Sequence, residues 1–461
     1  MHMFHDALVS FAERRVIYMS KYIDLYNQKK KTAAGAIEMI RNRDWIFTAQ
    51  AAAEPVGILQ ELQHLKDTGV RDIILNTCLP MDYPALHDPE MKKIMSHHGW
   101  FFSAALRKER PNKLVSAVPQ CSTTVLKKTL DRVRFEGRRP VVMATVSPMD
   151  DCGYMTLSIS AIYERDLINA GAYVILEVNK NYPRTFGDTL VHVSEADVLV
   201  ESDRPIPTAV AVPYTYVDEK IGKNVASLVE DGSTIQLGIG NIPNAVANEL
   251  KTKKHLGIHT EMFTETMVDL IECGAVDNSQ KGFYNGYSVC SFTMGSQRLY
   301  DFLDDNPSVL FKSSTFSNDP YTIGKNNKFV SINTTLEMDL MGQAASETVG
   351  YHQWSGTGGQ SETVQGAQMS PGGKSILAMH STYYAKDENG NKVLKSKIVP
   401  FLHEGAVVTT SRNDVDYVVT EYGIAWLRGL TVEERAKELI KIAHPDFREE
   451  LTKAVEEYEL W

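Results

Sequence analysis

The sequence predicts an α/β protein made of two similar domains with mostly parallel sheets. Short, continuous runs of aliphatic and β-branched residues recur between segments of helical spacing, as expected of strands covered on both faces. Related segments also repeat in the same order in the two halves of the chain. A glycine-rich turn follows one of the expected strands directly, which is typical of α/β sheets that bind a ligand at this edge.

The strand prediction depends on four apolar runs in which polar residues do not alternate with apolar ones. They cover residues 71–75, 141–146, 172–178 and 233–237. Such runs favour parallel strands buried between two layers of helices. Near the end of the chain, residues 432–443 carry aliphatic residues at helical spacing, with Glu first and Lys later, which predicts a packing helix aligned with its dipole.

Pairs of similar segments indicate an internal duplication. Residues 36–46 resemble residues 225–235, since each reads as a helix, a polar turn and the start of a strand. Two further pairs follow at nearly the same separation, residues 99–103 with 286–290 and residues 142–153 with 331–342. Any two α/β segments look somewhat alike, so the shared order is what favours duplication over chance.

The duplication and the prolines near residues 203–207 set the expected domain boundaries. We expect an N-terminal α/β domain over residues 19–205 and a C-terminal one over residues 206–461. Residues 1–18 precede a second plausible start at Met19 and are expected to be an N-terminal extension.

Composition excludes several classes of protein. A chain of 461 residues can hold two or three domains, and its net charge of −10 argues against wholesale binding to nucleic acid or anionic lipid. Its five cysteines are scattered, without a C-x-x-C pair or zinc-ligand spacing, which favours a reducing cytoplasm and no metal. No apolar run approaches the ~20 residues that span a bilayer, so no membrane partner is expected.

The sharpest local pattern is the stretch of residues 235–245, in which a buried strand runs into Gly238 and Gly240 and Pro243 lies near a helix start. Backbone N–H groups at such a turn attract a phosphate or carboxylate. A tight turn without a ligand is the alternative. Because Pro243 occupies the place of the third glycine in G-x-G-x-x-G, a NAD site is disfavoured.

Residues 253–263 predict a short apolar strand that ends near Glu261. Ligands gather at the carboxyl ends of strands in open α/β sheets, so Glu261 could face the glycine turn. A solvated or helix-capping glutamate is the alternative. His255 and His259 lack the spacing of a zinc-binding helix and do not indicate a metal site.

A second glycine cluster, residues 355–360, could place backbone N–H donors around an anion, or could be a flexible loop tip. Residues 370–375 do not form a phosphate-binding loop, because Gln368 stands where that motif needs glycine. The G-x-S-x-G motif of serine hydrolases is absent.

Several of these segments together resemble the acetyl-CoA hydrolase/CoA-transferase family. The similarity extends from about Thr32 to Phe447 and is greatest to members that act on 4-hydroxybutyryl-CoA or butyryl-CoA. The segments that carry it are residues 236–240, 255–262, 356–360, 409–414 and 416–425.

The resemblance implies two α/β domains of CoA-transferase type and a role for Glu261 as the nucleophile. Its carboxylate would attack the thioester of a short-chain acyl-CoA, pass through an anhydride to a glutamyl-CoA thioester, and be released by acetate in a ping-pong reaction. A covalent intermediate of this kind conserves the free energy of the thioester. The implied CoA-binding residues are Gly238, Ile239, Gly240, Asn241, Ile242, Asn318, Gly358 and Gly359.

The chain departs from the family pattern directly after Gly359 and Gln360. Many members continue with an aliphatic residue, Asp and Phe, whereas this chain has Ser361, Glu362 and Thr363. If this segment lines the acyl pocket, acyl specificity differs too.

Two other functions stay open at this point. Water could intercept the covalent intermediate, which would make the protein an acyl-CoA hydrolase, or the fold could sense a metabolite without turnover. We expect acyl-CoA and a carboxylate as the small-molecule partners, no tightly bound cofactor, and a homo-oligomer, most simply a dimer.

Overall fold

The computed structural model describes residues 21–209 and 213–460. The chain divides into two compact units. Unit 1 comprises Met1–Val118, Leu126–Thr208 and Tyr300–Ser313, and unit 2 comprises Pro119–Val125, Ala209–Leu299 and Ser314–Trp461. Pro119–Val125, here called the inserted segment, therefore belongs with the C-terminal half. The extension predicted for residues 1–18 lies outside the described residues.

The centre of unit 1 is a seven-stranded sheet in which every neighbouring pair is parallel, with the order β10-β7-β5-β1-β2-β3-β4. Its central strands are almost wholly buried, which explains their continuous apolar sequence. The strands are β1 (Trp45–Thr48), β2 (Ile73–Cys78), β3 (Met95–Phe101), β4 (Val115–Ala117), β5 (Pro140–Val146), β7 (Tyr173–Asn179) and β10 (Val198–Ser202).

Unit 2 is built on a six-stranded sheet with the order β12-β11-β17-β22-β26-β27, parallel except for the last pair. Because parallel strands share a direction, the loops that follow β11, β12, β17 and β22 leave at one edge of the sheet. The strands are β11 (Thr234–Leu237), β12 (Gly257–Ile258), β17 (Phe329–Thr334), β22 (Lys374–Ala378), β26 (Tyr417–Thr420) and β27 (Gly423–Trp426).

The two sheets share a strand order. In unit 1, β1 lies between β2 and β5, and in unit 2, β11 lies between β12 and β17. The segment pairs found in the sequence match β1 with β11 and β5 with β17. The predicted fold class, α/β with mostly parallel sheets, is confirmed, and the shared order supports the internal duplication.

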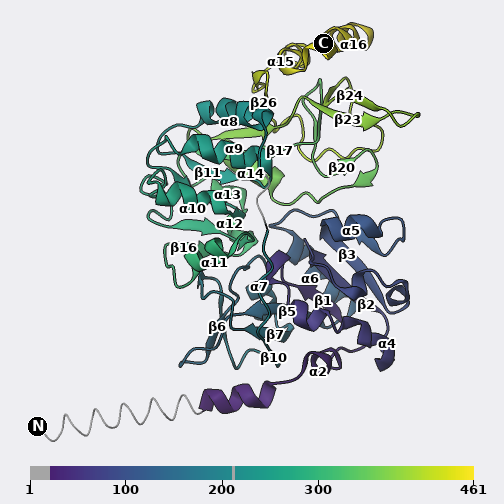
Figure 1. The fold of residues 1–461 in the computed structure, drawn as a ribbon, viewed down its shortest axis with the longest axis vertical. Coiled ribbons are helices and arrows are strands. Elements are labelled where there is room, and N and C mark those ends of the chain that lie inside the picture. Colours follow the sequence, from purple (N-terminus) through teal and green to yellow (C-terminus); the bar gives the residue numbers. More distant parts are fainter. Residues whose placement is uncertain (1–20, 210–212, 461) are drawn as a thin grey trace, which may run out of the picture. The chain divides into compact units, whose positions relative to one another are not determined.

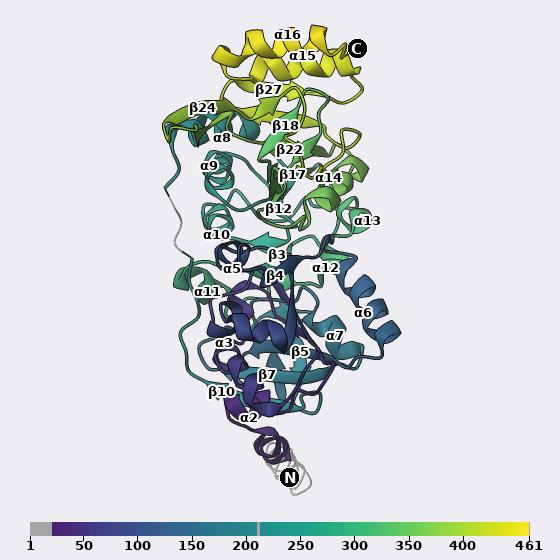
Figure 2. The same ribbon diagram turned by 90° about the vertical axis from the view of Figure 1, so that its right-hand side faces the viewer.

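Helices cover both faces of each sheet. In unit 1, α6 and α7 lie on one face and α3 on the other (Figure 2). The helices of this unit are α2 (Ala33–Ile37), α3 (Val56–Leu59), α4 (Leu65–Thr68), α5 (Ala104–Glu109), α6 (Val125–Glu136) and α7 (Glu164–Asn169). Apolar side chains of α2, α3, α4 and α5 join the strands in one core that includes Ile46, Leu75 and Val141.

In unit 2, α8, α9 and α10 cover one face of the sheet and α13 and α14 the other (Figure 2). The paired helices α15 and α16 end the chain (Figure 1). The helix predicted over residues 432–443 is α15, and it begins at a capping box of Thr431 and Glu434. The helices are α8 (Tyr216–Leu228), α9 (Asn241–Leu250), α10 (Glu265–Glu272), α12 (Ser314–Ser317), α13 (Pro320–Ile323), α14 (Gln360–Met369), α15 (Val432–Ile442) and α16 (Arg448–Glu457).

None of the helices within residues 21–209 and 213–460 has the length and apolar character needed to cross a bilayer.

Candidate active site

Glu261 lies at the edge of the unit 2 sheet, just after β12. The apolar strand predicted over residues 253–263 is in fact two short strands, β12 and β13 (Met262–Phe263), with Glu261 between them. The backbone N–H groups of Ser291 and Phe292 donate hydrogen bonds to the Glu261 carbonyl oxygen, at 2.9 and 3.1 Å. The main chain of Glu261 is therefore fixed from a neighbouring segment.

The Glu261 carboxyl group is partly buried and has neutral hydrogen-bond donors around it. Asn318 Nδ2 donates to Glu261 Oε2 at 2.5 Å, and Ser122 Oγ of the inserted segment donates to the same oxygen at 3.4 Å. Burial raises the pKa of Glu261, whereas Asn318, Ser122 and a backbone hydrogen bond of Gly359 lower it; the net direction is upward. This environment keeps a carboxylate poorly solvated but oriented, as nucleophilic attack requires.

Gly359 forms the third side of this cluster, where it caps the N-terminus of α14. A Cβ atom at this position would lie 2.0 Å from Asn318 Nδ2 and 2.2 Å from Glu261 Oε2. Only glycine leaves room for that hydrogen bond. The preceding Gly358 has a φ of +54° and forms a parallel β-bridge with Cys121, which connects the glycine loop to the inserted segment.

A second carboxyl group, that of Glu362, belongs to the same cluster. Glu362 lies in the first turn of α14 and is only 5% exposed. The Thr123 backbone N–H donates to Glu362 Oε1 at 2.9 Å, and the Thr123 hydroxyl donates to the same oxygen. Burial raises the pKa of Glu362 to about 7, and the charge of Glu261 acts in the same direction.

The three residues that depart from the family pattern therefore have different surroundings. Ser361 Oγ donates to the Thr409 carbonyl oxygen at 2.6 Å, and Thr363 Oγ1 accepts from Ser331 Oγ at 2.9 Å in a buried polar cluster of the sheet. Of these three residues, Glu362 is the one whose side chain reaches the surroundings of Glu261.

The predicted CoA-binding loop leaves the sheet beside this cluster, because it follows β11, the strand that pairs with β12. Gly240 has a φ of +120° and precedes α9, and a Cβ atom there would meet nothing within 4 Å, so open space adjoins the backbone. The loop comprises Gly238 and Ile239, followed by Gly240 and by Asn241 and Ile242, which begin α9.

The structure thus separates the predicted site residues into two groups. Glu261, Asn318, Gly358 and Gly359 lie in one cluster. The loop of residues 238–242 leaves the same edge of the sheet, but among the described residues it forms no hydrogen bond with Glu261.

His259 is connected to the cluster around Glu261 through Ser317. Its ring is 1% exposed, and Nε2 donates to the Ser317 carbonyl oxygen at 2.7 Å. Burial, and then the neighbouring Lys281, lower the pKa of His259 to about 3, so the ring is neutral. Ser317 Oγ in turn donates to Asn318 Oδ1 at 3.0 Å, which orients the amide that binds Glu261.

Lys281 is a fully buried lysine beneath β12. Its Nζ donates to the carbonyl oxygens of Ile258 and Tyr287, at 2.8 and 2.7 Å. Burial lowers the pKa of Lys281 to about 7. A Cβ atom at Gly257 would collide with the Lys281 stem, so the strand and this lysine are packed closely four residues before Glu261.

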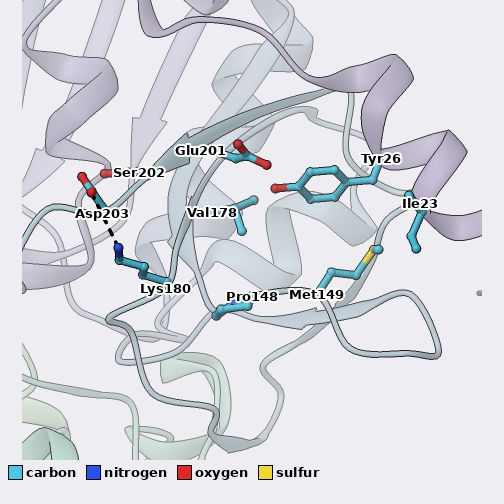
Figure 3. Close-up of a pocket in the computed structure, with 9 residues that line it drawn as sticks. All are labelled: Ile23, Tyr26, Pro148, Met149, Val178, Lys180, Glu201, Ser202 and Asp203. Carbon is cyan, nitrogen blue, oxygen red and sulfur yellow. Dashed lines mark ion pairs between the residues drawn. The ribbon is translucent and has the colours of Figure 1, made fainter.

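A separate surface pocket lies wholly in unit 1 (Figure 3). Lys180 and Asp203 form an ion pair of 3.6 Å at one side of it. None of the predicted site residues lines this pocket, so it is not part of the candidate active site.

Three residues of unit 2 were missed by reasoning from the sequence. Ser122 and Thr123 come from a short polar stretch about 139 residues before Glu261, and no catalytic motif covers that stretch. From the sequence alone, Lys281 is expected at the surface, because lysine side chains are rarely buried. The run of hydroxyl side chains at residues 122–124 is the one feature that could have drawn attention.

Comparison with known proteins decides the family. The acetyl-CoA hydrolase/transferase N-terminal domain matches residues 15–213, and the C-terminal domain of the same name matches residues 295–455. The 4-hydroxybutyrate coenzyme A transferase of Clostridium kluyveri is 40% identical over 93% of this chain and 97% of its own length. The chain belongs to the acetyl-CoA hydrolase/transferase family.

Other members of the acetyl-CoA hydrolase/transferase family are similar over much of the chain. The succinyl-CoA:cyclohexane-1-carboxylate CoA transferase of Geobacter metallireducens is 49% identical over 68% of this chain and 70% of its own length. The butyryl-CoA:acetate CoA-transferase of Anaerostipes caccae is 32% identical over 95% of this chain and 98% of its own length. The resemblance seen in the sequence is confirmed.

Solved structures give the same result. RipA from Yersinia pestis has a TM-score of 0.86 and a sequence identity of 33%. A 4-hydroxybutyrate CoA-transferase from Porphyromonas gingivalis has a TM-score of 0.75 and a sequence identity of 34%. Each comparison covers 95% of this chain and 100% of the other. The prediction of a CoA-transferase enzyme is confirmed, and a sensor without turnover is not supported.

Proposed function

We propose that this CoA-transferase moves CoA from a short-chain acyl-CoA to a small carboxylate such as acetate, with Glu261 as the nucleophile. The acyl groups most in keeping with its relatives are 4-hydroxybutyryl and butyryl, and the relative from Geobacter adds a cyclic carboxylate as a candidate.

The observation that carries this proposal is the set of neutral donors on one oxygen of Glu261. Asn318 and Ser122 both donate to Oε2, so Oε1 is the oxygen assigned to the attack. Because the carboxylate is already ionised when it reacts, no general base is needed to activate it. The same donors face the place where negative charge returns when the glutamyl group is released.

The reaction conserves charge at each step. A carboxylate oxygen of Glu261 forms a bond to the acyl carbon, the C–S bond breaks, and CoA thiolate leaves. The thiolate then attacks the Glu261 carbonyl carbon of the anhydride, which releases the acyl group as its carboxylate and leaves a glutamyl-CoA thioester. The incoming acid repeats these steps in reverse and regenerates the Glu261 carboxylate.

Two groups of backbone donors would hold CoA. The predicted binding residues Gly238–Ile242 precede or begin α9, where free N–H groups favour an anion such as a phosphate. Gly358 and Gly359 would face the thioester oxygen, together with Asn318. CoA is thus a substrate in this scheme, and no further cofactor has a role.

Initial-rate kinetics test the proposal. Butyryl-, 4-hydroxybutyryl-, acetyl- and succinyl-CoA would be assayed against acetate, butyrate, 4-hydroxybutyrate and cyclohexane-1-carboxylate. A covalent ping-pong mechanism gives parallel double-reciprocal lines. Without an acceptor, CoA release should be slower by at least about a hundredfold, which is roughly 2.7 kcal/mol between two barriers. Equal release with and without acceptor would make the protein a hydrolase.

Replacing the nucleophile gives a second test. Glu261→Ala should abolish transfer but change CoA affinity by less than about tenfold, or 1.4 kcal/mol, because the glycine loops supply most of the binding. Glu272→Ala, which removes an exposed glutamate at the end of α10, is the matched control and should retain full activity. Turnover of more than a few per cent in Glu261→Ala would exclude covalent catalysis through this residue.

Two expectations from the sequence accompany this proposal. None of the five cysteines, all of which lie within the described residues, forms a disulfide, which is in keeping with the proposed reducing, cytoplasmic setting. The enzyme is proposed to act as a homodimer, which light scattering of the purified protein would test.

A further inference from the structure

Glu362 carries a buried oxygen atom without a partner. Oε1 of this side chain accepts two hydrogen bonds from Thr123, whereas Oε2 is buried and has no hydrogen-bond partner among the described residues. An unsatisfied polar atom in such a place is costly, and a buried carboxylate oxygen without a donor is more so. Oε2 therefore needs either a proton with an acceptor, or a ligand.

The hydrogen bonds decide which oxygen bears the proton when Glu362 is neutral. An oxygen that accepts from both the Thr123 N–H and the Thr123 hydroxyl is the carbonyl-type oxygen of the acid. The proton then lies on Oε2, which becomes a hydrogen-bond donor that no described protein group uses.

The neighbours of Glu362 favour its neutral form. From the segment after β12, the charge of Glu261 raises the pKa of Glu362, and two like charges this close do not ionise together readily. The inserted segment contributes Thr123, whose two hydrogen bonds lower the pKa of Glu362. Asn318 lowers the pKa of Glu362 but makes no hydrogen bond of ordinary geometry to Oε2, and the adjacent Asp319 binds Thr322 instead.

We propose that Glu362 recognises the acceptor acid: its Oε2–H donates a hydrogen bond to the carboxylate that attacks the glutamyl-CoA thioester. This inference rests on the proposed function, in which Glu261 carries CoA. Every acceptor must bring a carboxylate oxygen within bonding distance of the Glu261 carbonyl carbon. The polar groups that surround Glu261 therefore also surround the acceptor.

The charges balance throughout the acceptor step. One acceptor oxygen forms the new C–O bond to the Glu261 carbonyl carbon, the C–S bond breaks, and CoA thiolate leaves with the negative charge. Glu362 keeps its proton and contributes only the hydrogen bond. If Glu362 were ionised, it would repel the acceptor instead, and its Oε2 would have no donor to offer.

The test uses the two halves of the ping-pong reaction. The kcat/KM for acetate reports on the glutamyl-CoA form of the enzyme, and the kcat/KM for butyryl-CoA reports on the free enzyme. In the glutamyl-CoA form, Glu261 is uncharged, so Glu362 should lose its proton near or below pH 7. The wild-type kcat/KM for acetate should then fall about tenfold per pH unit on the alkaline side.

Glu362→Gln keeps a neutral donor at the position of Oε2 and an acceptor for Thr123. This variant should lose the alkaline fall between pH 6 and 9 and stay within about fivefold of the wild-type acid plateau. Glu362→Ala should lower kcat/KM for acetate by at least about fiftyfold and for butyryl-CoA by a similar factor, because the departing acid retraces the contacts of the incoming one. Glu164→Gln, which neutralises a buried glutamate of unit 1, is the control and should keep the wild-type profile.

The result that overturns the inference is an alkaline fall that persists in Glu362→Gln, or is missing in the wild type. An unchanged kcat/KM for acetate in Glu362→Ala would also overturn it, since the acceptor would then lose no hydrogen bond. If Glu362→Ala fails to fold, the profile of Glu362→Gln decides alone. Failure of the proposed function looks different, because the wild type would then form no glutamyl-CoA.

Discussion

The side-chain amide of Asn318 donates a hydrogen bond to the carboxylate of Glu261 across 2.5 Å. This donor lowers the pKa of a carboxyl group whose pKa burial raises. Two other residues fix the geometry of this hydrogen bond. Ser317 orients the Asn318 amide, and Gly359 has no side chain that would collide with it. The pair therefore determines at which pH the nucleophile is ionised.

Asn318→Ala should move the acid side of the profile of kcat/KM for acyl-CoA to higher pH. Without the donor the pKa of Glu261 rises, so less of the group is ionised at a given pH below it. The maximal rate should also fall by at least about tenfold, because an oriented donor is lost. Ser122→Ala removes the longer contact of 3.4 Å and should shift the profile less. An unchanged acid side in Asn318→Ala would contradict this account.

Gly359→Ala should lower kcat by about a hundredfold or more while the protein still folds. The new Cβ atom would meet the ends of the Asn318 and Glu261 side chains, which can move aside but then lose their alignment. Gly35→Ala, in α2 and likewise outside the left-handed region, controls for the loss of backbone freedom on substitution. Full activity in Gly359→Ala would show that this alignment is unimportant.

Thr123→Val should move the alkaline side of the profile for acetate to higher pH. The Thr123 hydroxyl lowers the pKa of Glu362, so its loss raises that pKa and keeps the acid neutral over a wider range. The neighbouring Thr124 is the control, because its buried hydroxyl has no hydrogen-bond partner among the described residues. The account fails if Thr124→Val shifts the profile as much as Thr123→Val.

Lys281→Met should remove a pH-dependent part of the stability. The pKa of Lys281 is about 7 in the folded protein and 10.5 as its ordinary value, so between these pH values the unfolded chain binds more protons. The free energy of unfolding of the wild type should therefore rise with pH in this window, by up to about 1.4 kcal/mol per unit from this group. Below pH 7 the contribution is constant.

Denaturant unfolding of both proteins from pH 7 to 10 measures this difference. Other groups titrate alike in the two proteins, so the difference between them isolates Lys281. Lys328→Met replaces a lysine in a surface ion pair with Glu230 and serves as the control. Parallel pH dependences for the wild type and Lys281→Met would mean that the buried amine stays charged.

The fold was predictable because buried parallel strands have continuous apolar sequences. The runs at residues 71–75, 141–146, 172–178 and 233–237 correspond to β2, β5, β7 and β11. The repeated order of segments also anticipated that β11 takes the place of β1. The brevity of β12 was not predictable, because its two residues are extended chiefly through pairing with β11.

The candidate site was predictable only where local sequence carries the signal. Gly238 directly follows a strand and Gly359 lies in a glycine cluster, so both loops carry a local signal. A family resemblance was needed to single out Glu261 from other glutamates. Ser122 and Thr123 reach the site through tertiary folding of the inserted segment, which no local pattern encodes. Glu362 stood out in the sequence as a departure, but its partner Thr123 did not.

The most direct test of the central claim is mass spectrometry of the enzyme after incubation with butyryl-CoA in the absence of an acceptor. We expect CoA attached through a thioester to Glu261, within the peptide that contains His259 to Met262, and its loss when acetate is added. Attachment to another glutamate, such as Glu362 or the hydrogen-bonded Glu421, would contradict the assignment of the nucleophile. An unmodified protein that nonetheless transfers CoA would contradict covalent catalysis altogether.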